Sequence, residues 1–348
     1  MDRWKKRPEG SNWGDFGPDD QKGRLNLLTP ERVRAAVAEV REGQSFCLSL
    51  PLDYPGGNAM NANRHPPILR PSLRNGGVNM NYVYSAQNAH SHDVLSDDLA
   101  ILHLQYSTQW DGLCHVGAVF DVMDDGQPLP VYYNGFRAGV DVVGPDRIED
   151  CGLQGEIPPR STSQAKALGI ENMAATGVQG RGVMIDLRRH FGDARTRVGH
   201  DLLMQVIEAD GIEIAPGDML CLHTGLADLI LGMRKDPDPA VIHGSCAVLD
   251  GGDPALQDWI RDSGISVIAS DNYAVEDFPA ELPNPCCSML PLHNLCLFRL
   301  GIHLGELWHM TPLAEWLAAR GRHHFLLTAP PLRLPGAVGS PVTPVATV

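Results

Sequence analysis

The densest group of polar side chains in the sequence lies between residues 105 and 115. Gln105, Gln109 and Asp111 precede a turn at Gly112, and His115 follows it. On an extended backbone alternate side chains share a face, so these residues can converge once the turn brings His115 back. An acid and an imidazole placed together could bind a metal ion or exchange protons with a substrate. A structural role is the alternative, because an Asp and a His near a turn often satisfy backbone groups.

A second group lies between Pro291 and His309. Pro291 suits the first turn of a helix and Gly301 its C-terminus, so His293 falls at the start of a predicted helix and Glu306 on an extended segment after it. Leucine and tryptophan flank Glu306. A carboxylate in such apolar company needs a cation, a hydrogen-bond donor or a proton. This need makes Glu306 a candidate functional residue, with His293 beside it.

Other reactive side chains have plainer interpretations. The 8 cysteines are spread along the chain without metal-type spacing, and we interpret them as buried thiols, although the adjacent Cys286 and Cys287 could mark a reactive site. His223 lies on an apolar strand and is interpreted as a core histidine. Arg64 and His65 precede two prolines, and they could reach a substrate carboxylate if their loop folds over the site.

The charge balance excludes several classes of protein. The chain of 348 residues has 42 Asp and Glu against 28 Lys and Arg, a formal net charge of -14, and its basic residues are scattered. Such a surface repels polyanions, which argues against nucleic acid as a partner. No apolar run of about 18 residues predicts a membrane span, and no apolar stretch near the N-terminus predicts a secretory signal. We therefore expect a cytoplasmic protein that acts on a small molecule.

The predicted elements indicate an α/β fold. A helix is expected to follow Thr29 and to end at Gly43, and alternation over 101–106 predicts a strand. In the second half short apolar strands alternate with helices. Asp253 and Thr311 are candidate N-caps for two of these helices. The strands are expected over 183–187, 219–224 and 265–269, and the helices over 201–209, 254–261 and 312–319. Residues 51–93, rich in Pro, Gly and Asn, predict a long loop.

Taken together, these blocks resemble the cyclase family of metal-dependent hydrolases, which includes bacterial kynurenine formamidase and isatin hydrolase. The resemblance extends over most of the chain, and the further blocks that carry it are 11–20, 25–30, 180–186, 217–225 and 269–272. It implies one domain over 1–348 with a swivelling β/α/β-type α/β fold and a mixed sheet, assembled as a homodimer or homotetramer. We expect an N-terminal arm over 1–28 and an extended C-terminal tail over 328–348.

The family motif is His-x-Gly-Thr-His-x-Asp-x-Pro-x-His, in which both early histidines and the aspartate bind metal and the last histidine is an acid or base. Here Gln105 and Gln109 stand where the two early histidines belong, Asp111 stands at the aspartate and His115 at the last histidine. The chain therefore belongs with a longer subgroup that departs from the motif at both glutamines. Their amides can act as weak ligands or hold a substrate carbonyl.

The later histidine and carboxylate of the family correspond to His293 and Glu306. The resemblance then implies at most one divalent metal, held by Asp111, His293 and Glu306. One imidazole and two carboxylates suit zinc or manganese with open positions for water and substrate.

The resulting prediction is a hydrolase that opens or cleaves a small cyclic or acyl amide or ester, of lactone or lactam type, by metal-activated water. His115 is the expected acid and base, and Glu306 is expected to ligate the ion or hold the water. The predicted substrate-binding residues are Gln105, Gln109, Trp110, Tyr133 and Asn134.

Two alternatives remain open at this stage. If the glutamines abolish metal binding, His115 and Glu306 could run acid/base chemistry without an ion, as a cyclase, dehydratase or isomerase. The chain could also be a catalytically dead member that binds a small molecule.

Overall fold

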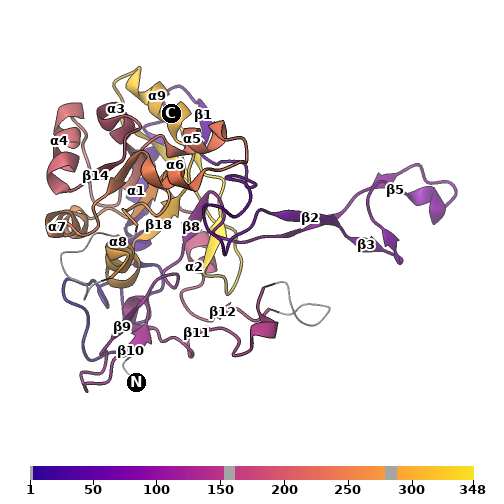
Figure 1. Cartoon of the computed structure of the whole chain (residues 1–348), viewed down its shortest axis with the longest axis horizontal. Helices are drawn as coiled ribbons and strands as arrows, with labels where there is room; N and C mark the ends of the chain where they lie inside the picture. Colours follow the sequence, from indigo (N-terminus) through magenta and orange to yellow (C-terminus); the bar gives the residue numbers. More distant parts are fainter. Residues whose placement is uncertain (1–2, 153–160, 279–287) are drawn as a thin grey trace.

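The computed structural model of the chain describes residues 3–152, 161–278 and 288–348, and its centre is a nine-stranded mixed sheet (Figure 1). The strands of this sheet are β1 (Ser45–Cys47), β8 (Gln109–Asp111), β13 (Gln179–Asp186), β15 (Met219–His223), β17 (Val267–Ser270), β18 (His303–Glu306), β19 (His324–Thr328), β20 (Gly339–Pro341) and β21 (Val345–Thr347). They lie in the order β1-β21-β19-β13-β15-β17-β18-β8-β20. The central strands β13, β15, β17 and β18 are parallel, and the strands at either side are antiparallel to their neighbours.

Helices connect the parallel strands and cover both faces of the sheet, because parallel strands need long crossover connections (Figure 1). They are α1 (Pro30–Val37), α2 (Ile170–Ala174), α3 (Leu187–Phe191), α4 (His200–Asp210), α5 (Leu226–Gly232), α6 (Pro239–Gly244), α7 (Pro254–Ser263), α8 (Pro291–His293) and α9 (Thr311–Ala318). A π-helix, Asn294–Leu300, continues directly from α8. The α/β fold predicted from the sequence is confirmed.

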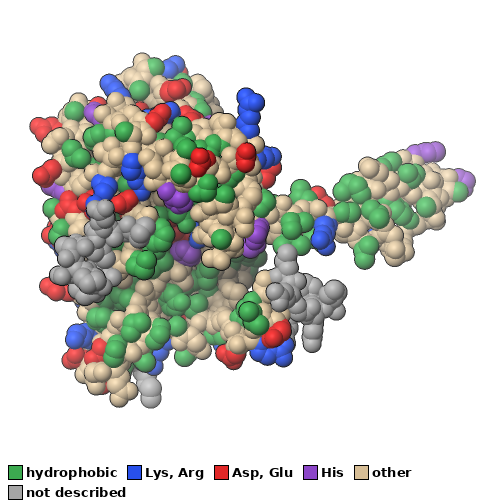
Figure 2. Space-filling view, viewed as in Figure 1, with side chains coloured by type: hydrophobic (Ala, Val, Ile, Leu, Met, Phe, Trp, Pro, Cys, Tyr) green, Lys and Arg blue, Asp and Glu red, His purple; other side chains and the backbone are tan. Residues whose placement is uncertain are grey.

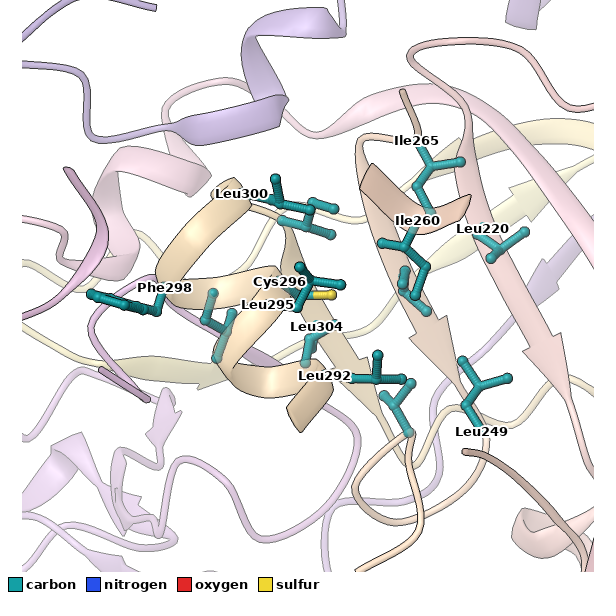
Figure 3. Packing of buried hydrophobic residues seen from close by; sticks show 14 of the residues in the cluster. Leu220, Leu249, Ile260, Ile265, Leu292, Leu295, Cys296, Phe298, Leu300 and Leu304 are labelled. Atoms are coloured by element: carbon teal, nitrogen blue, oxygen red, sulfur yellow. The ribbon is translucent and has the colours of Figure 1, made fainter. Parts of the chain in front are cut away.

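The sheet buries a hydrophobic cluster on each face. Successive side chains of a strand point to opposite faces, so Val183 and Ile185 of β13 belong to one cluster and Met184 to the other. Helices α4 and α7 and the π-helix complete the first cluster, and α9 completes the second. Figure 3 shows Leu292 and Cys296 of α8 and the π-helix beside Leu304 of β18. Full burial of each such side chain contributes about 1.5–3 kcal/mol.

The helix starts test the predicted N-caps. Thr29 and Asp253 each accept a hydrogen bond from a backbone N–H in the first turn of the following helix, as predicted. The prediction for Thr311 is wrong. Its hydroxyl instead lies 3.0 Å from Nε2 of His223, and Met310 occupies the N-cap position without a side-chain hydrogen bond.

Two boundaries also differ from prediction. Helix α1 ends at Val37 instead of reaching Gly43. The strand expected over 101–106 is divided, because a backbone turn from His103 to Tyr106 separates Ile101, the last residue of a ribbon strand, from β8. The apolar alternation over 101–106 therefore spans a turn and does not mark a single strand.

Residues 68–101 form a ribbon of paired strands that projects from the body, where a long loop was predicted (Figure 1). Its pairs are β2 (Ile68–Pro71) with β7 (Asp98–Ile101), β3 (Leu73–Arg74) with β4 (Gly77–Val78), and β5 (Tyr82–Val83) with β6 (Val94–Leu95). We call it the projecting ribbon. Hydrophobic side chains lie along its surface (Figure 2), and Leu73 is 80% and Leu69 67% exposed.

The C-terminal tail, predicted to be extended, lies across the body of its own chain. Strand β21 inserts between β1 and β19, and β20 pairs with β8, the strand that carries Asp111. The tail therefore supports the edge of the sheet at which the candidate site lies.

The cysteines are less uniformly buried than predicted. Among the described residues, Cys114, Cys221, Cys246 and Cys296 are buried, whereas Cys47 and Cys151 are exposed. The pair at positions 286 and 287 lies outside the described residues. Within the described ranges, none of the helices is long and apolar enough to cross a membrane.

Candidate functional site

Two neighbouring antiparallel strands position the carboxylates of the candidate site. Asp111 ends β8 and Glu306 ends β18, and the register places Gln109 opposite Glu306. Gln109 and Asp111 are two residues apart on one strand, so their side chains share a face. His293 reaches the same place from the end of α8. All four side chains are buried.

The three predicted metal ligands converge. One ligand atom from each of Asp111, His293 and Glu306 can be chosen so that all lie within 4.8 Å of one another. Nε2 of His293 is 3.3 Å from Oε1 of Glu306 and 3.8 Å from Oδ2 of Asp111. Two carboxylates and an imidazole nitrogen therefore face a common point.

Glu276 holds the other side of the imidazole. Its Oε1 is 2.8 Å from Nδ1 of His293 and also accepts the backbone N–H of His293 at 2.9 Å, while its Oε2 accepts the N–H of Leu292 at 2.8 Å. Once a metal ion displaces the proton on Nε2, Glu276 would keep the proton on Nδ1, which is the arrangement of metal-binding histidines. Sequence reasoning missed Glu276. The same signal that identified Glu306, an acid in apolar company, was available in Ala274-Val-Glu276.

The pKa values show how strongly the site favours positive charge. Burial opposes the charging of His293, but its hydrogen bonds to Glu276 and Glu306 outweigh burial and raise its pKa to about 10. Burial raises the pKa of Asp111. Burial also acts to raise the pKa of Glu306, but the hydrogen bond to His293 is stronger and the pKa is lowered. A positive charge in this buried place is therefore stabilised.

Two buried acceptor atoms at the site have no hydrogen-bond partner: Oδ2 of Asp111 and Oε1 of Gln109. The amide N–H₂ of Gln109 donates to Oε2 of Glu306 at 3.1 Å and to Oδ1 of Asp111 at 3.4 Å. Buried oxygens are rarely left without a donor or a cation. A divalent cation held by Asp111, His293 and Glu306 fits this donor set, because it would supply the partner that Asp111 lacks.

Glu306 lines a pocket that opens to solvent and measures about 320 Å³ when the open solvent within it is counted. Its lining combines polar and flat apolar side chains: Arg64, His115, Tyr273, Ala274, Phe278, Leu290, His293 and Glu306. Nε2 of His115 lies 3.7 Å from Oδ1 of Asp111, and its side chain is 22% exposed. An imidazole that contacts both the buried acid and the pocket can exchange protons with a bound molecule.

Four predicted substrate-binding residues lie away from this pocket. Trp110 is fully buried in the core, where its N–H donates to the carbonyl of Ala329, and Tyr133 is fully buried as well. Asn134 donates to backbone carbonyls of the N-terminal segment, and Gln105 packs its amide against Gly339. Of the predicted set, Gln109 alone lies with the acids. Three residues that line the pocket were not predicted from the sequence: Tyr273, Phe278 and Leu290.

Comparison with known proteins places the fold. The family model described as "Putative cyclase" matches residues 48–277, more than half of the chain. The chain is similar to the crystal structure of a novel cyclase, with 29% sequence identity and a TM-score of 0.73 over 97% of both chains. No curated protein matches the sequence.

Isatin hydrolases share the fold at low identity. Isatin hydrolase A from Labrenzia aggregata, bound to benzyl benzoate, has 12% identity and a TM-score of 0.54 over 93% of this chain and 98% of that chain. Isatin hydrolase A from Ralstonia solanacearum has 12% identity and a TM-score of 0.53 over 91% of this chain and 97% of that chain. The fold class implied by the sequence resemblance is confirmed.

Proposed function

Since the chain belongs to the cyclase family, we propose that it is a hydrolase that opens or cleaves a small cyclic or acyl amide or ester at the pocket beside Asp111. The convergence of Asp111, His293 and Glu306 within 4.8 Å, all buried, is the observation that carries the proposal. A zinc or manganese ion is the proposed cofactor, because two carboxylates and one imidazole suit either ion. The fold shared with isatin hydrolases supports the reaction class.

Asp111, His293 and Glu306 would hold the ion, which when bound lowers the pKa of water and polarises a carbonyl. His115 faces the pocket and takes the water proton, then returns it to the leaving nitrogen or oxygen. Glu276 keeps the proton of His293 on Nδ1 and so fixes the ring.

The substrate is held by the remaining wall of the pocket. Tyr273, Phe278 and Leu290 present an apolar surface, which suits an aromatic or planar ring. Gln109 holds both carboxylates in place through its amide N–H groups, and its carbonyl oxygen is buried beside them without a donor.

A hydrolysis screen tests this proposal. Protein stripped with chelator and reloaded with zinc or manganese is offered lactones, lactams and N-acyl amides, and products are identified by mass spectrometry. We expect turnover with reloaded protein, none after stripping, and loss of turnover in His115→Ala. The exposed His92 of the projecting ribbon provides the matched control His92→Ala, which should keep full activity. Turnover that His115→Ala retains would contradict the proposed role of His115.

Metal-independent acid/base chemistry is the second candidate, and Gln109 is the observation that favours it. Its amide already bridges Glu306 and Asp111, where the family motif has a metal-binding histidine. In that case His115 and Glu306 would catalyse ring closure, elimination or isomerisation. Activity that persists in protein without stoichiometric metal would support this candidate over the first. A catalytically dead member would bind ligand but show no turnover with any of these substrates.

We further propose that the chain acts as a homodimer or homotetramer in which a second copy covers the projecting ribbon. An isolated two-stranded ribbon is marginally stable in water, and this ribbon exposes Leu69, Leu73, Val78 and Val94. Sedimentation analysis should give an oligomer for the full chain and a monomer when residues 72–97 are replaced by a short glycine linker. A monomeric full chain would contradict the proposal.

A further inference from the structure

Arg64 is brought into the pocket by a loop that lies outside the motifs of the site. A turn with a hydrogen bond of 3.1 Å from the N–H of Arg64 to the carbonyl of Asn61 sets its backbone direction. Nη1 of Arg64 then donates to the carbonyl of Gln105 at 2.7 Å. The loop is tied a second time, because the amide of Asn61 donates to the hydroxyl of Tyr273 at 3.3 Å. The guanidinium is therefore held at the pocket by the fold.

The guanidinium lacks an ionic partner of its own. Within residues 3–152, 161–278 and 288–348, Arg64 makes that one side-chain hydrogen bond and no ion pair. Half-buried arginines usually place their fork of N–H donors on a carboxylate or phosphate. Here Arg64 lines the pocket and the structure gives its remaining N–H donors no carboxylate.

Another part of the pocket lining consists of apolar and aromatic side chains. Tyr273, Phe278 and Leu290 line it together with Arg64. A ligand that satisfies both parts has a planar apolar body and an anionic group at one edge. The cavity of about 320 Å³, part of which is open solvent, limits it to a small molecule.

We propose that Arg64 binds a carboxylate of the substrate, so that the substrate class is a planar amide, ester, lactone or lactam that carries a carboxylate beside its scissile bond. This inference rests on the proposed hydrolase function for the position of the scissile bond. The carboxylate of the substrate accepts two N–H donors of Arg64, and the apolar body lies against Tyr273 and Phe278. Arg64 thereby selects a negatively charged substrate and determines which end of it faces Asp111.

Binding of a matched pair of probes tests the inference without turnover. The probes are 2-acetamidobenzoate and its neutral isostere 2-acetamidobenzamide, titrated calorimetrically into chelator-treated protein, in which no turnover is expected. We expect the wild-type chain to bind the benzoate about ten- to a hundredfold more tightly than the benzamide, as for a hydrogen-bonded charge pair. Arg64→Gln should abolish this preference, and Arg64→Lys should retain part of it because the charge remains.

The matched control is Arg333→Gln, at an exposed position in the C-terminal tail, which should keep the preference of the wild-type chain. Thermal unfolding confirms that each variant is folded. Equal binding of the two probes by the wild-type chain, a preference that survives in Arg64→Gln, or no binding of either probe at millimolar concentration would overturn the inference. Failure of the proposed hydrolysis is recognised separately, because the probe preference would then persist while no amide, ester or lactone is cleaved.

Discussion

Among the described residues, two groups place a histidine between carboxylates in the interior, and they differ in how completely their polar atoms are paired. In one group His223 at the end of β15 has Asp186 at 2.7 Å from Nδ1 and Thr311 at 3.0 Å from Nε2. The neighbouring Asp271 accepts three hydrogen bonds of 2.7 Å from Thr224 and Gly225. At the pocket, by contrast, Oδ2 of Asp111 has no partner.

This difference separates a structural group from a candidate site. A fully paired buried network stabilises the fold, whereas a buried acceptor without a donor costs free energy unless a ligand supplies the missing partner. His223 was interpreted from the sequence as a core histidine, and its neighbours complete its hydrogen bonds within the fold. His293 has the same residue types around it, but its Nε2 faces a pocket and two carboxylates. The comparison therefore predicts opposite consequences for mutations in the two groups.

The largest expected effect is on stability, from Asp271→Ala. This change leaves two backbone N–H groups and one hydroxyl without an acceptor in the interior, so the free energy of unfolding should fall by about 3–5 kcal/mol. Urea denaturation measures it. Asp111→Ala in metal-free protein should change the free energy of unfolding by less than about 1 kcal/mol, because Oδ2 of Asp111 accepts no hydrogen bond that the mutation could break. Equal losses in the two variants would remove the distinction between the groups.

Metal binding should show the reverse order. Asp111→Asn removes a charged ligand, and we expect the affinity for zinc or manganese to fall by at least about a hundredfold. This loss exceeds the one expected when a residue that only supports a ligand is mutated. Competition with a chromophoric chelator measures this affinity. Asp186→Asn, in the paired group, is the control and should bind metal as the wild-type chain does. A similar loss in Asp186→Asn would show that the effect comes from general destabilisation.

Glu276→Gln should have an intermediate effect on the affinity for metal. The amide can still accept the proton of Nδ1 of His293 but carries no charge, so the affinity for metal should fall about ten- to a hundredfold while the chain stays folded. The same chelator competition measures it, with circular dichroism as the folding control. Unchanged affinity would mean that Glu276 only supports the backbone of α8.

The smallest expected effect is a pH dependence of stability from the paired group. Burial acts to lower the pKa of His223, but its pairing with Asp186 and Asp271 outweighs this and raises the pKa, while the pKa of Asp186 is lowered against its burial by the hydrogen bond from His223. The contribution of His223 is full below its unfolded pKa of about 6.5 and is lost as the pH rises through its raised folded value. The contribution of Asp186 is present above about pH 3.9 and is lost as the pH falls through its lowered value.

The stability difference between the wild-type chain and His223→Gln should therefore be greatest between about pH 4 and 6.5 and should shrink at higher pH. Urea denaturation over this range measures it, and His92→Gln on the projecting ribbon serves as the control. A difference that grows above neutral pH would mean that His223 is neutral in the folded chain.

The parts of the fold that could be predicted are those specified by local sequence. The strands β13 and β15 are apolar runs, the helices α4 and α7 have apolar periodicity, and Asp253 caps α7, so each lies close to its predicted position. The projecting ribbon was missed because its strands are two to four residues long, have mixed polarity, and depend on pairing between segments such as β2 and β7.

The site shows the same division. The sequence grouped Asp111, His293 and Glu306 through a family resemblance, and the structure brings these three side chains together. Trp110 could have been excluded, because a side chain between Gln109 and Asp111 on a strand must point to the opposite face. The pocket position of Arg64 could be predicted only on the condition that its loop folds over the site, since it depends on a contact with the carbonyl of Gln105, 41 residues along the chain.

Elemental analysis of the metal content per chain tests the central claim most directly. The wild-type chain, purified without chelator and titrated with zinc or manganese, should retain one ion per chain, and Asp111→Asn should retain none while Asp186→Asn retains one. A wild-type chain that holds no ion after titration would contradict the account, as would an Asp111→Asn variant that holds as much as the wild-type chain.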